Sequence, residues 1–302
     1  MASKHAQDIL QVVQEDSYHL ECYYDKLKDW TFKSVWFDLP VAKAKVLGEA
    51  RARKVRCQPE DLLLNELALE IDDQITKVGG KAVVRLSTRS PKDIVLQRPP
   101  MFDYFEQEEN TLKNDGLRED VRQMIAMTRA AGRAMAVSSG REAVDMFIDS
   151  QRIFDDVNTA CSVEPPHILR VLVREFVPLR SELELRVFVN DGKVSAISQY
   201  YASCQVKWLH ENKERVQNEI FNAVEKVLPL LGLAEFVIDF AYDTNEKLWV
   251  VEVNLPPPLA GMSMFDKKNP EDVAIVSGQR DFEFRLAPLD AVEDCREKYK
   301  MF

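Results

Sequence analysis

The chain has 302 residues, of which 46% are hydrophobic and 30% are charged. This composition excludes a disordered chain and leaves enough apolar residues for a sizeable core. The 50 acidic and 40 basic residues give a net charge of −10. We expect no direct nucleic-acid partner, because contact with phosphates needs clustered Lys and Arg.

The cysteines and the apolar runs predict a reduced cytoplasmic protein. The cysteine count is five, an odd number, and no Cys-x-x-Cys pair is present. We therefore expect neither a disulfide partner nor a zinc site. No apolar run reaches the ~18 residues of a membrane span. The first residues, MASKHAQDIL, lack the apolar stretch of a signal peptide.

The first half of the chain predicts helices with two short strands between them. Residues 1–29 are polar and are expected to be helical in part. Alternating apolar and polar residues predict a strand over 31–37, and KAVVRL predicts another over 81–86. The segments 117–136 and 140–157 predict two helices.

The second half predicts mainly strands. A helix is expected over 213–231, with Gly232 as its stop. The predicted strands are 170–177, 183–189, 193–200, 235–242 and 248–254. This order indicates the α+β class, with helices covering one face of an antiparallel sheet.

The last two strands predict a hairpin with three polar side chains on one face. Its sequence is EFVIDFAYDTNEKLWVVEVN, residues 235–254. A turn near 245–246 places Asp239 directly opposite Glu252, and the strand period of two adds Asn254 to the same face. Opposed carboxylates repel unless a positive group lies between them. Two carboxylates and an amide oxygen suit Mg²⁺, which also takes substrate phosphates. The alternative is an ordinary solvated outer face.

Two arginines are candidates for phosphate binding. Arg85 lies in the early strand, and Arg186 lies in the strand over 183–189. An arginine fork matches phosphate oxygens, although a surface ion pair is the alternative for each. The sequence contains neither G-x-x-x-x-G-K-[ST] nor G-x-G-x-x-G, so a P-loop or a dinucleotide fold has no support.

Several segments, taken in order, resemble the cell division cycle protein 123 family. They are WTFKSVWFDLP (30–40), VRLSTRSPKD (84–93), LVREFVPLRSELELRVFVNDGKVSAISQ (172–199), the strands FVIDF and WVVEVN, and DFEFRL (281–286). The hairpin with its Asp, Glu and Asn also resembles the metal-binding end of ATP-grasp proteins.

The resemblance implies a two-lobed ATP-grasp fold, whose antiparallel sheets clamp ATP and Mg²⁺. The N-terminal lobe would span 1–165 and the C-terminal ATP-grasp lobe 166–302. No catalytic residue is implied. Binding of the phosphates would fall to Arg85 and Arg186, lining of the adenine pocket to Arg174, Glu175, Phe176 and Val177, and metal binding to Asp239, Glu252 and Asn254.

Three departures mark the chain as a divergent member of that family. Arg85 stands where the family typically has a lysine. Glu252-Val253-Asn254-Leu255 replaces Asp-Phe-Asn-Pro. Glu175-Phe176 replaces the lysine and tryptophan typical of eukaryotic members.

The resemblance also implies a function, namely an assembly chaperone for eukaryotic translation initiation factor 2 that binds its gamma subunit. One alternative is an ATP-dependent ligase, or a phosphoryl or adenylyl transferase, of the ATP-grasp type. Another is a binding module whose nucleotide site has been lost. We expect that removal of one carboxylate from the repelling pair raises the stability of the free protein.

Overall fold

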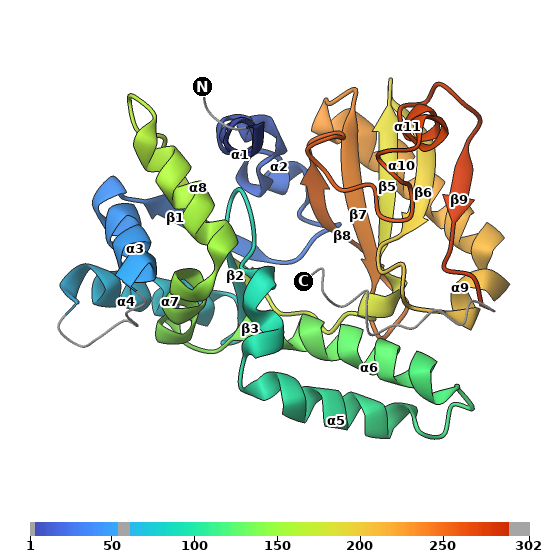
Figure 1. The fold of residues 1–302 in the computed structure, drawn as a ribbon, viewed down its shortest axis with the longest axis horizontal. Helices are drawn as coiled ribbons and strands as arrows, with labels where there is room; N and C mark the ends of the chain where they lie inside the picture. Colours follow the sequence, from blue (N-terminus) through green and yellow to red (C-terminus); the bar gives the residue numbers. More distant parts are fainter. Residues whose placement is uncertain (1–3, 54–60, 290–302) are drawn as a thin grey trace.

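The computed structural model describes residues 4–53 and 61–289, which form two sheets side by side (Figure 1). The first sheet has four strands in the order β1-β4-β2-β3. Its neighbouring strands are antiparallel. The strands are β1 (Ser34–Leu39), β2 (Ala82–Leu86), β3 (Ala136–Val137) and β4 (Leu169–Glu175).

Helices of the first half of the chain cover this sheet and supply a large apolar core. The core includes Leu67 and Ile71 of α4, Val144 of α7 and Val171 of β4, all of them buried. The helices are α1 (Lys4–Gln14), α3 (Val41–Arg53), α4 (Leu62–Lys77), α7 (Gly140–Asp149) and α8 (Gln151–Ser162). The helix α2 (Leu20–Leu27) instead packs in the core of the second sheet. Short 3₁₀ turns, η1 (Asp16–Tyr18) and η2 (Lys92–Gln97), lie between elements of this half.

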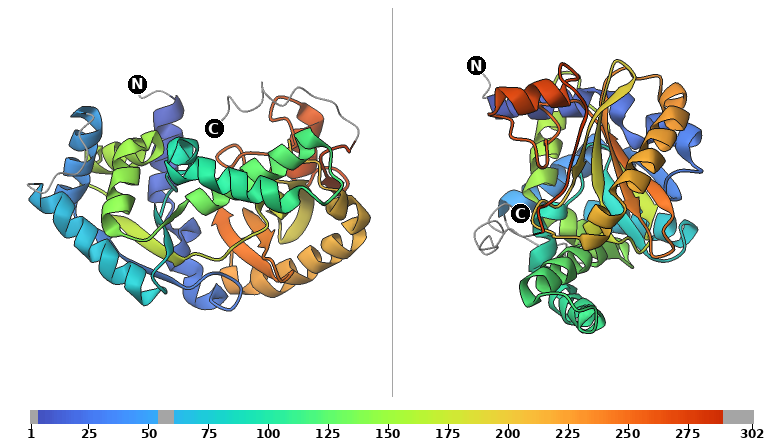
Figure 2. Two further views of the ribbon diagram at one scale, coloured as in Figure 1. Left: turned by 90° about the horizontal axis from the view of Figure 1, so that it is seen from below. Right: turned by 90° about the vertical axis from the view of Figure 1, so that its right-hand side faces the viewer.

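A pair of packed helices, α5 (Pro100–Leu112) and α6 (Glu119–Ala134), projects from the first sheet. It lies below the second sheet in Figure 1 and along the lower edge of the right-hand view of Figure 2. α6 confirms the helix predicted over 117–136, whereas α5 was not predicted.

The second sheet has five strands in the order β8-β7-β5-β6-β9. β9 is parallel to β6, and the other pairs are antiparallel. The strands are β5 (Leu185–Asn190), β6 (Lys193–Gln199), β7 (Phe236–Tyr242), β8 (Leu248–Asn254) and β9 (Glu283–Arg285). The remaining elements are η3 (Ser181–Leu183), α9 (Lys207–Glu211), α10 (Lys213–Leu231) and α11 (Pro270–Val276).

Helices cover both faces of the second sheet, so the expectation of a single covered face is wrong. Val216 and Ile220 of α10 pack with Val187 on one face. Ile275 of α11 packs with Phe188 on the other. Neighbouring strand residues point to opposite faces, and both faces here are apolar enough to need a cover.

The structure confirms the α+β class, together with most of the predicted elements. The helix over 213–231 ends at Gly232, whose φ of 70° is the left-handed conformation that favours glycine. The helix predicted over 140–157 is instead two helices. They are divided at Ser150, whose side chain accepts a hydrogen bond from the Ile153 N–H and caps α8.

The strand predicted over 170–177 does not join the other C-terminal strands. As β4 it pairs with β1 and β2 in the first sheet. The proposed lobes 1–165 and 166–302 stay a prediction, although β4 falls on the C-terminal side of that boundary. Across the described ranges, no helix is long and apolar enough to cross a membrane.

Candidate functional site

A cavity of about 570 Å³ lies where the two sheets meet α6. The first sheet and its following segment contribute Arg85 and residues 174–177, and the second sheet contributes Glu252. α6 contributes Arg129 and Arg133. Polar side chains thus come from both sheets and from the helices, and part of the wall is apolar, formed by Phe32, Val83, Val95, Met135, Phe176, Val177 and Val251.

The segment predicted to line the adenine pocket does line this cavity, but Arg174 has a structural role as well. Its guanidinium donates to the Val251 carbonyl and to the Thr31 hydroxyl, both at 2.8 Å, and lies 4.8 Å from the centre of the Phe32 ring. Burial lowers the pKa of Arg174 to about 10. Arg174 therefore ties β4 to β8, the outermost strand of the second sheet.

The main chain of this segment is partly committed to the sheet. The N–H groups of Glu175 and Phe176 donate to the carbonyls of Lys33 and Lys81. Val177, whose N–H donates to no residue in the described ranges, is the remaining main-chain donor before Pro178. This segment can therefore offer one main-chain N–H, that of Val177, as a hydrogen-bond donor to a ligand in the cavity.

Asp239 on β7 is buried and forms a two-pronged ion pair with Arg186 on the neighbouring strand β5. The Nε and Nη2 atoms of Arg186 lie 2.8 and 2.7 Å from the two carboxylate oxygens of Asp239. The third guanidinium nitrogen donates to the Gly261 carbonyl. Burial alone would lower the pKa of Arg186, but the Asp239 charge raises it above its usual value. For Asp239 burial dominates, and its pKa is raised despite Arg186.

Glu252 on β8 pairs with Arg85, which belongs to the first sheet. Burial would raise the pKa of Glu252, but the guanidinium of Arg85 holds that pKa well below its usual range. Arg85 also donates to the carbonyls of Leu86 and Thr88, so its own loop fixes its direction. This ion pair and the hydrogen bond from Arg174 to the Val251 carbonyl are both direct polar links between the two sheets at the cavity.

Asp239 and Glu252 are cross-strand partners, as the hairpin pattern predicts. The amide nitrogen of Asn254 donates to Asp239 at 3.1 Å, which places Asn254 on the same face. The positive groups paired with the carboxylates are Arg186 and Arg85, so each carboxylate has a counter-charge from the protein itself. Within the described residues, no group of three or more His, Cys, Asp or Glu side chains is arranged to hold a metal ion.

The donor set still fits a hard cation at one place. The Oε1 atom of Glu252 and the Oδ1 atom of Asn254 accept no hydrogen bond from any described residue. Both side chains line a second, adjoining cavity, whereas Asp239 lies behind them and is fully buried. Carboxylate and amide oxygens are the ligands that Mg²⁺ takes alongside substrate phosphates. Glu252 and Asn254 are therefore the members of the predicted set that face a cavity.

The prediction of functional residues missed Lys92, Tyr200 and Glu184, which line the same cavity. The Lys92 ammonium donates to the Tyr200 hydroxyl at 2.8 Å. Burial and the nearby Asp239 charge raise the pKa of Glu184 to about 8. Two signals were in the sequence: Lys92 belongs to the Ser-Pro-Lys-Asp run, and Glu184 lies two residues from Arg186.

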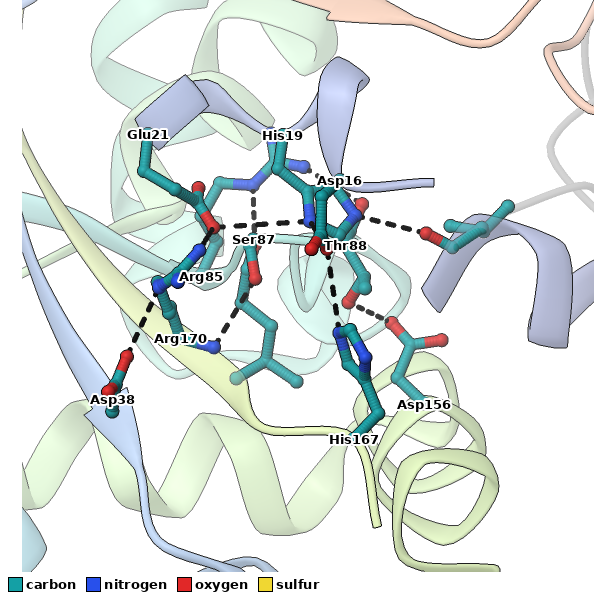
Figure 3. A network of polar contacts seen from close by, with 12 residues as sticks. Asp16, His19, Glu21, Asp38, Arg85, Ser87, Thr88, Asp156, His167 and Arg170 are labelled. Carbon is teal, nitrogen blue, oxygen red and sulfur yellow. Dashed lines mark hydrogen bonds and ion pairs between the residues drawn. The ribbon is translucent and has the colours of Figure 1, made fainter. Parts of the chain in front are cut away.

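Beside Arg85, the segment after β2 is held by a further polar network (Figure 3). The Thr88 hydroxyl donates to Asp156 of α8 at 2.6 Å. Ser87 continues the pairing of β2 with β4 through its N–H, which donates to the Arg170 carbonyl. Arg170 in turn lies 3.0 Å from Glu21 of α2. The direction of Arg85 is thus set by contacts from several elements.

Comparison with known proteins agrees with this architecture. The sequence model of the D123 family matches residues 138–299, more than half of the chain. A putative CDC123-like protein of Acanthamoeba polyphaga mimivirus is 23% identical over 231 residues, which are 74% of this chain. The chain spans only 60% of the length of that relative.

Two solved structures share the fold. Cdc123 from Schizosaccharomyces pombe superposes with a TM-score of 0.67 at 18% identity, over 94% of this chain and 98% of that one. A C-terminally truncated form of the same protein gives a TM-score of 0.66 at 19% identity, over 95% and 99% of the two chains. With more than half of its length matched by the family model, the chain belongs to the D123 family, the family of Cdc123.

Proposed function

We propose that this protein binds ATP together with Mg²⁺ between its two sheets, with the base in the first cavity and the phosphates at the wall that this cavity shares with the adjoining one. The observation that carries the proposal is two arginine–carboxylate pairs at this boundary. Arg85 and Glu252 form the shared wall, and Arg186, which pairs with Asp239, lines the adjoining cavity. The two pairs bring two positive and two negative side chains together. When Mg²⁺ and a polyphosphate bind, the carboxylates can turn to the cation and the arginines to the phosphates, so that no buried charge is left unpaired.

The division follows from simple charge complementarity. Mg²⁺ would be held by Glu252 and Asn254, with Asp239 behind them. Arg85 and Arg186 would turn toward the phosphates, where the guanidinium fork gives two parallel hydrogen bonds. Lys92 lines the same wall and adds a third positive group. Bound Mg²⁺ would neutralise part of the negative charge of the phosphates.

The adenosine part would lie against residues 174–177. Phe32, Val83 and Phe176 offer apolar surface there, and Val177 offers its main-chain N–H. A mostly apolar pocket with a few placed polar groups is the common form of a small-molecule site. Arg174 supports this wall from behind rather than facing the base.

We propose further that the nucleotide-bound protein acts in the cytoplasm as an assembly chaperone for translation initiation factor 2, through the gamma subunit. Membership of the D123 family supports this role, as does the net charge of −10, which favours encounter with a basic surface.

An ATP-dependent ligase or transferase is the second candidate. A second polar cavity, which adjoins the first across the Arg85–Glu252 pair, favours it, because group transfer needs room for an acceptor. The two candidates differ in turnover. A chaperone should hydrolyse ATP slowly or not at all, whereas a ligase should release ADP or AMP in step with consumption of an acceptor.

Titration calorimetry with ATP, in the presence and absence of Mg²⁺, tests the nucleotide proposal. We expect saturable binding that depends on Mg²⁺. Absence of heat under both conditions, in protein whose folding is verified by circular dichroism, would contradict it. A pull-down with the isolated gamma subunit, with and without ATP and Mg²⁺, tests the chaperone role separately.

A further inference from the structure

The second cavity has a volume of about 370 Å³ and walls largely of its own. It shares Arg85, Ser90, Lys92, Arg174, Tyr200 and Glu252 with the first cavity, but it does not include residues 175–177. Its remaining walls come from η1 and α2, the segment 87–89, the start of α8, Arg186 of β5 and the segments 253–255 and 259–261. It therefore offers space for a group beyond the proposed nucleotide site.

Positive side chains dominate the lining of this cavity. Two carboxylates, Glu15 and Glu252, face it. Two further carboxylates lie behind the wall, where Asp156 pairs with Arg89 and Asp239 pairs with Arg186. The lining cations are Arg85, Arg89, Lys92, Arg152, Arg174 and Arg186. They outnumber all four of these carboxylates, so the cavity favours an anion.

Three cations of this lining, Lys92, Arg152 and Arg174, form no ion pair among the described residues. Lys92 donates to Tyr200, and Arg174 donates to Val251 and Thr31, whereas the side chain of Arg152 donates to no described residue. Arg152 lies in the first turn of α8, and its Nε atom is buried without a hydrogen-bond partner in the described structure. No carboxylate in the described ranges forms an ion pair with its guanidinium, and the Nη2 atom of Arg89 lies close by, 3.1 Å from the Arg152 carbonyl oxygen. Burial, with a smaller effect from Arg89, lowers the pKa of Arg152. A buried donor without an acceptor is costly, and an oxyanion would remove that cost.

The wall beside Arg152 is already fixed in place. Asp156 is fully buried and accepts hydrogen bonds from the Thr88 hydroxyl and from Nε of Arg89, at 2.6 and 2.9 Å. Figure 3 shows how Thr88 and Asp156 join the segment after β2 to α8. Little side-chain freedom would therefore be lost when a ligand binds, which favours affinity.

We propose that Arg152 anchors an oxyanion site in the second cavity, which takes a carboxylate or phosphate group of a second ligand rather than the phosphates of the nucleotide. Arg152 belongs to α8 and lines the second cavity alone. Arg85 and Lys92 lie on the wall that the two cavities share, and Arg186 and Asn254 line the second cavity from the second sheet. The planar fork of a guanidinium suits either oxyanion. The site adjoins the proposed nucleotide site but does not depend on it.

Titration of the protein with acetate and with inorganic phosphate tests the proposal, with chloride added to keep the ionic strength constant. Binding is followed by NMR chemical shifts, first without nucleotide and then with saturating ADP and Mg²⁺. We expect at least one probe to bind in both states. Arg152→Gln should weaken it by about tenfold or more, because a charged hydrogen-bond partner is lost. The preferred probe identifies whether the second ligand offers a carboxylate or a phosphate.

Two variants control the experiment. Arg280→Gln removes the same charge from an exposed side chain that lines neither cavity, and it should bind both probes as the wild type does. Arg152→Lys keeps the charge without the fork, so it should recover part of the affinity and shows that the position tolerates change.

Three outcomes would overturn the oxyanion site. The first is that neither probe binds, and the second is equal affinity in wild type and Arg152→Gln. The third is that Arg152→Gln weakens the binding of ATP but not of ADP, which would assign Arg152 to the terminal phosphate of the nucleotide. Probe binding with no ADP binding would instead contradict the proposed nucleotide function and leave the oxyanion site standing.

Discussion

Asp239 and Glu252 lie directly opposite each other in the β7–β8 ladder, yet each is neutralised by a different part of the fold. Arg186, the partner of Asp239, belongs to the same sheet, and Arg85, the partner of Glu252, belongs to the other. The first pair is thus internal to the second sheet, whereas the second pair joins the two sheets across the cavity. For this reason the two carboxylates should respond differently to substitution.

Asp239→Asn should destabilise the protein, contrary to the expectation drawn from the two carboxylates alone. The substitution leaves Arg186 buried without its counter-charge, and loss of one partner of a buried pair costs about 3–5 kcal/mol. Glu252→Gln should cost less, because the side chain of Glu252 is 23% exposed and that of Asp239 is 1% exposed. Urea unfolding measures the free energy of unfolding of both variants. An Asp239→Asn protein that is more stable than the wild type would contradict the prediction.

Arg85→Ala should weaken ATP binding about tenfold or more while adenosine binding changes little. The guanidinium faces the cavity wall proposed for the phosphates, and adenosine has no phosphates. Arg85→Lys keeps the charge without the guanidinium fork, so its affinity for ATP should lie between those of the wild type and Arg85→Ala. Calorimetry with ATP and adenosine compares the losses. Equal losses for both ligands would mean that Arg85 does not contact phosphate.

Glu184→Gln should flatten the dependence of stability on pH. The pKa of Glu184 is raised from 4.5 to about 8 in the folded protein, chiefly by burial. Between these two values the folded protein keeps a proton that the unfolded chain releases, so this contribution to stability falls as pH rises. Urea unfolding between pH about 5 and about 8 should therefore show a smaller decline in the variant than in the wild type.

The control for this experiment is Glu211→Gln, because the side chain of Glu211 is 57% exposed and lies away from the cavity. It should follow the wild-type pH profile. A Glu184→Gln profile that also follows the wild type would show that Glu184 titrates at its ordinary value in the folded protein.

Gly140→Ala should destabilise the crossing of α4 and α7. A Cβ atom at Gly140 would lie 1.8 Å from the main-chain oxygen of Ala68, so the helices would have to separate. Overpacking of this kind costs about 1–3 kcal/mol, and a main-chain clash places the cost at the upper end. Gly48→Ala is the comparison. Its new Cβ atom would lie 3.0 Å from the side-chain oxygen of Asn158, which can rotate away, so this variant should lose less stability than Gly140→Ala. Thermal unfolding measures both.

Sequence pattern alone predicted the elements whose signals are local. The apolar residues of α10, such as Val216, Ile220 and Val224, and the glycine that ends this helix, Gly232, all lie within one short segment. The pairing of Asp239 with Glu252 agrees with the predicted register, but a bulge produces it. Phe240 pairs with Val250, and the next residue, Asp239, pairs with Glu252, so that the register shifts between the turn and the carboxylates. The α5 helix escaped prediction, and its exposed Phe102 and polar Glu106 weaken the apolar stripe by which a helix is recognised.

The sequence by itself determined the α+β class, the hairpin with its three polar side chains and the family resemblance, because alternation, turns and motifs are properties of neighbouring residues. Only the tertiary structure decided that β4 joins the first sheet and that Arg85 meets Glu252, 167 residues further along the chain. It also decided that Arg152 faces a cavity without a carboxylate partner among the described residues. These relationships depend on how buried charges are matched when distant segments pack, and no local pattern encodes that matching.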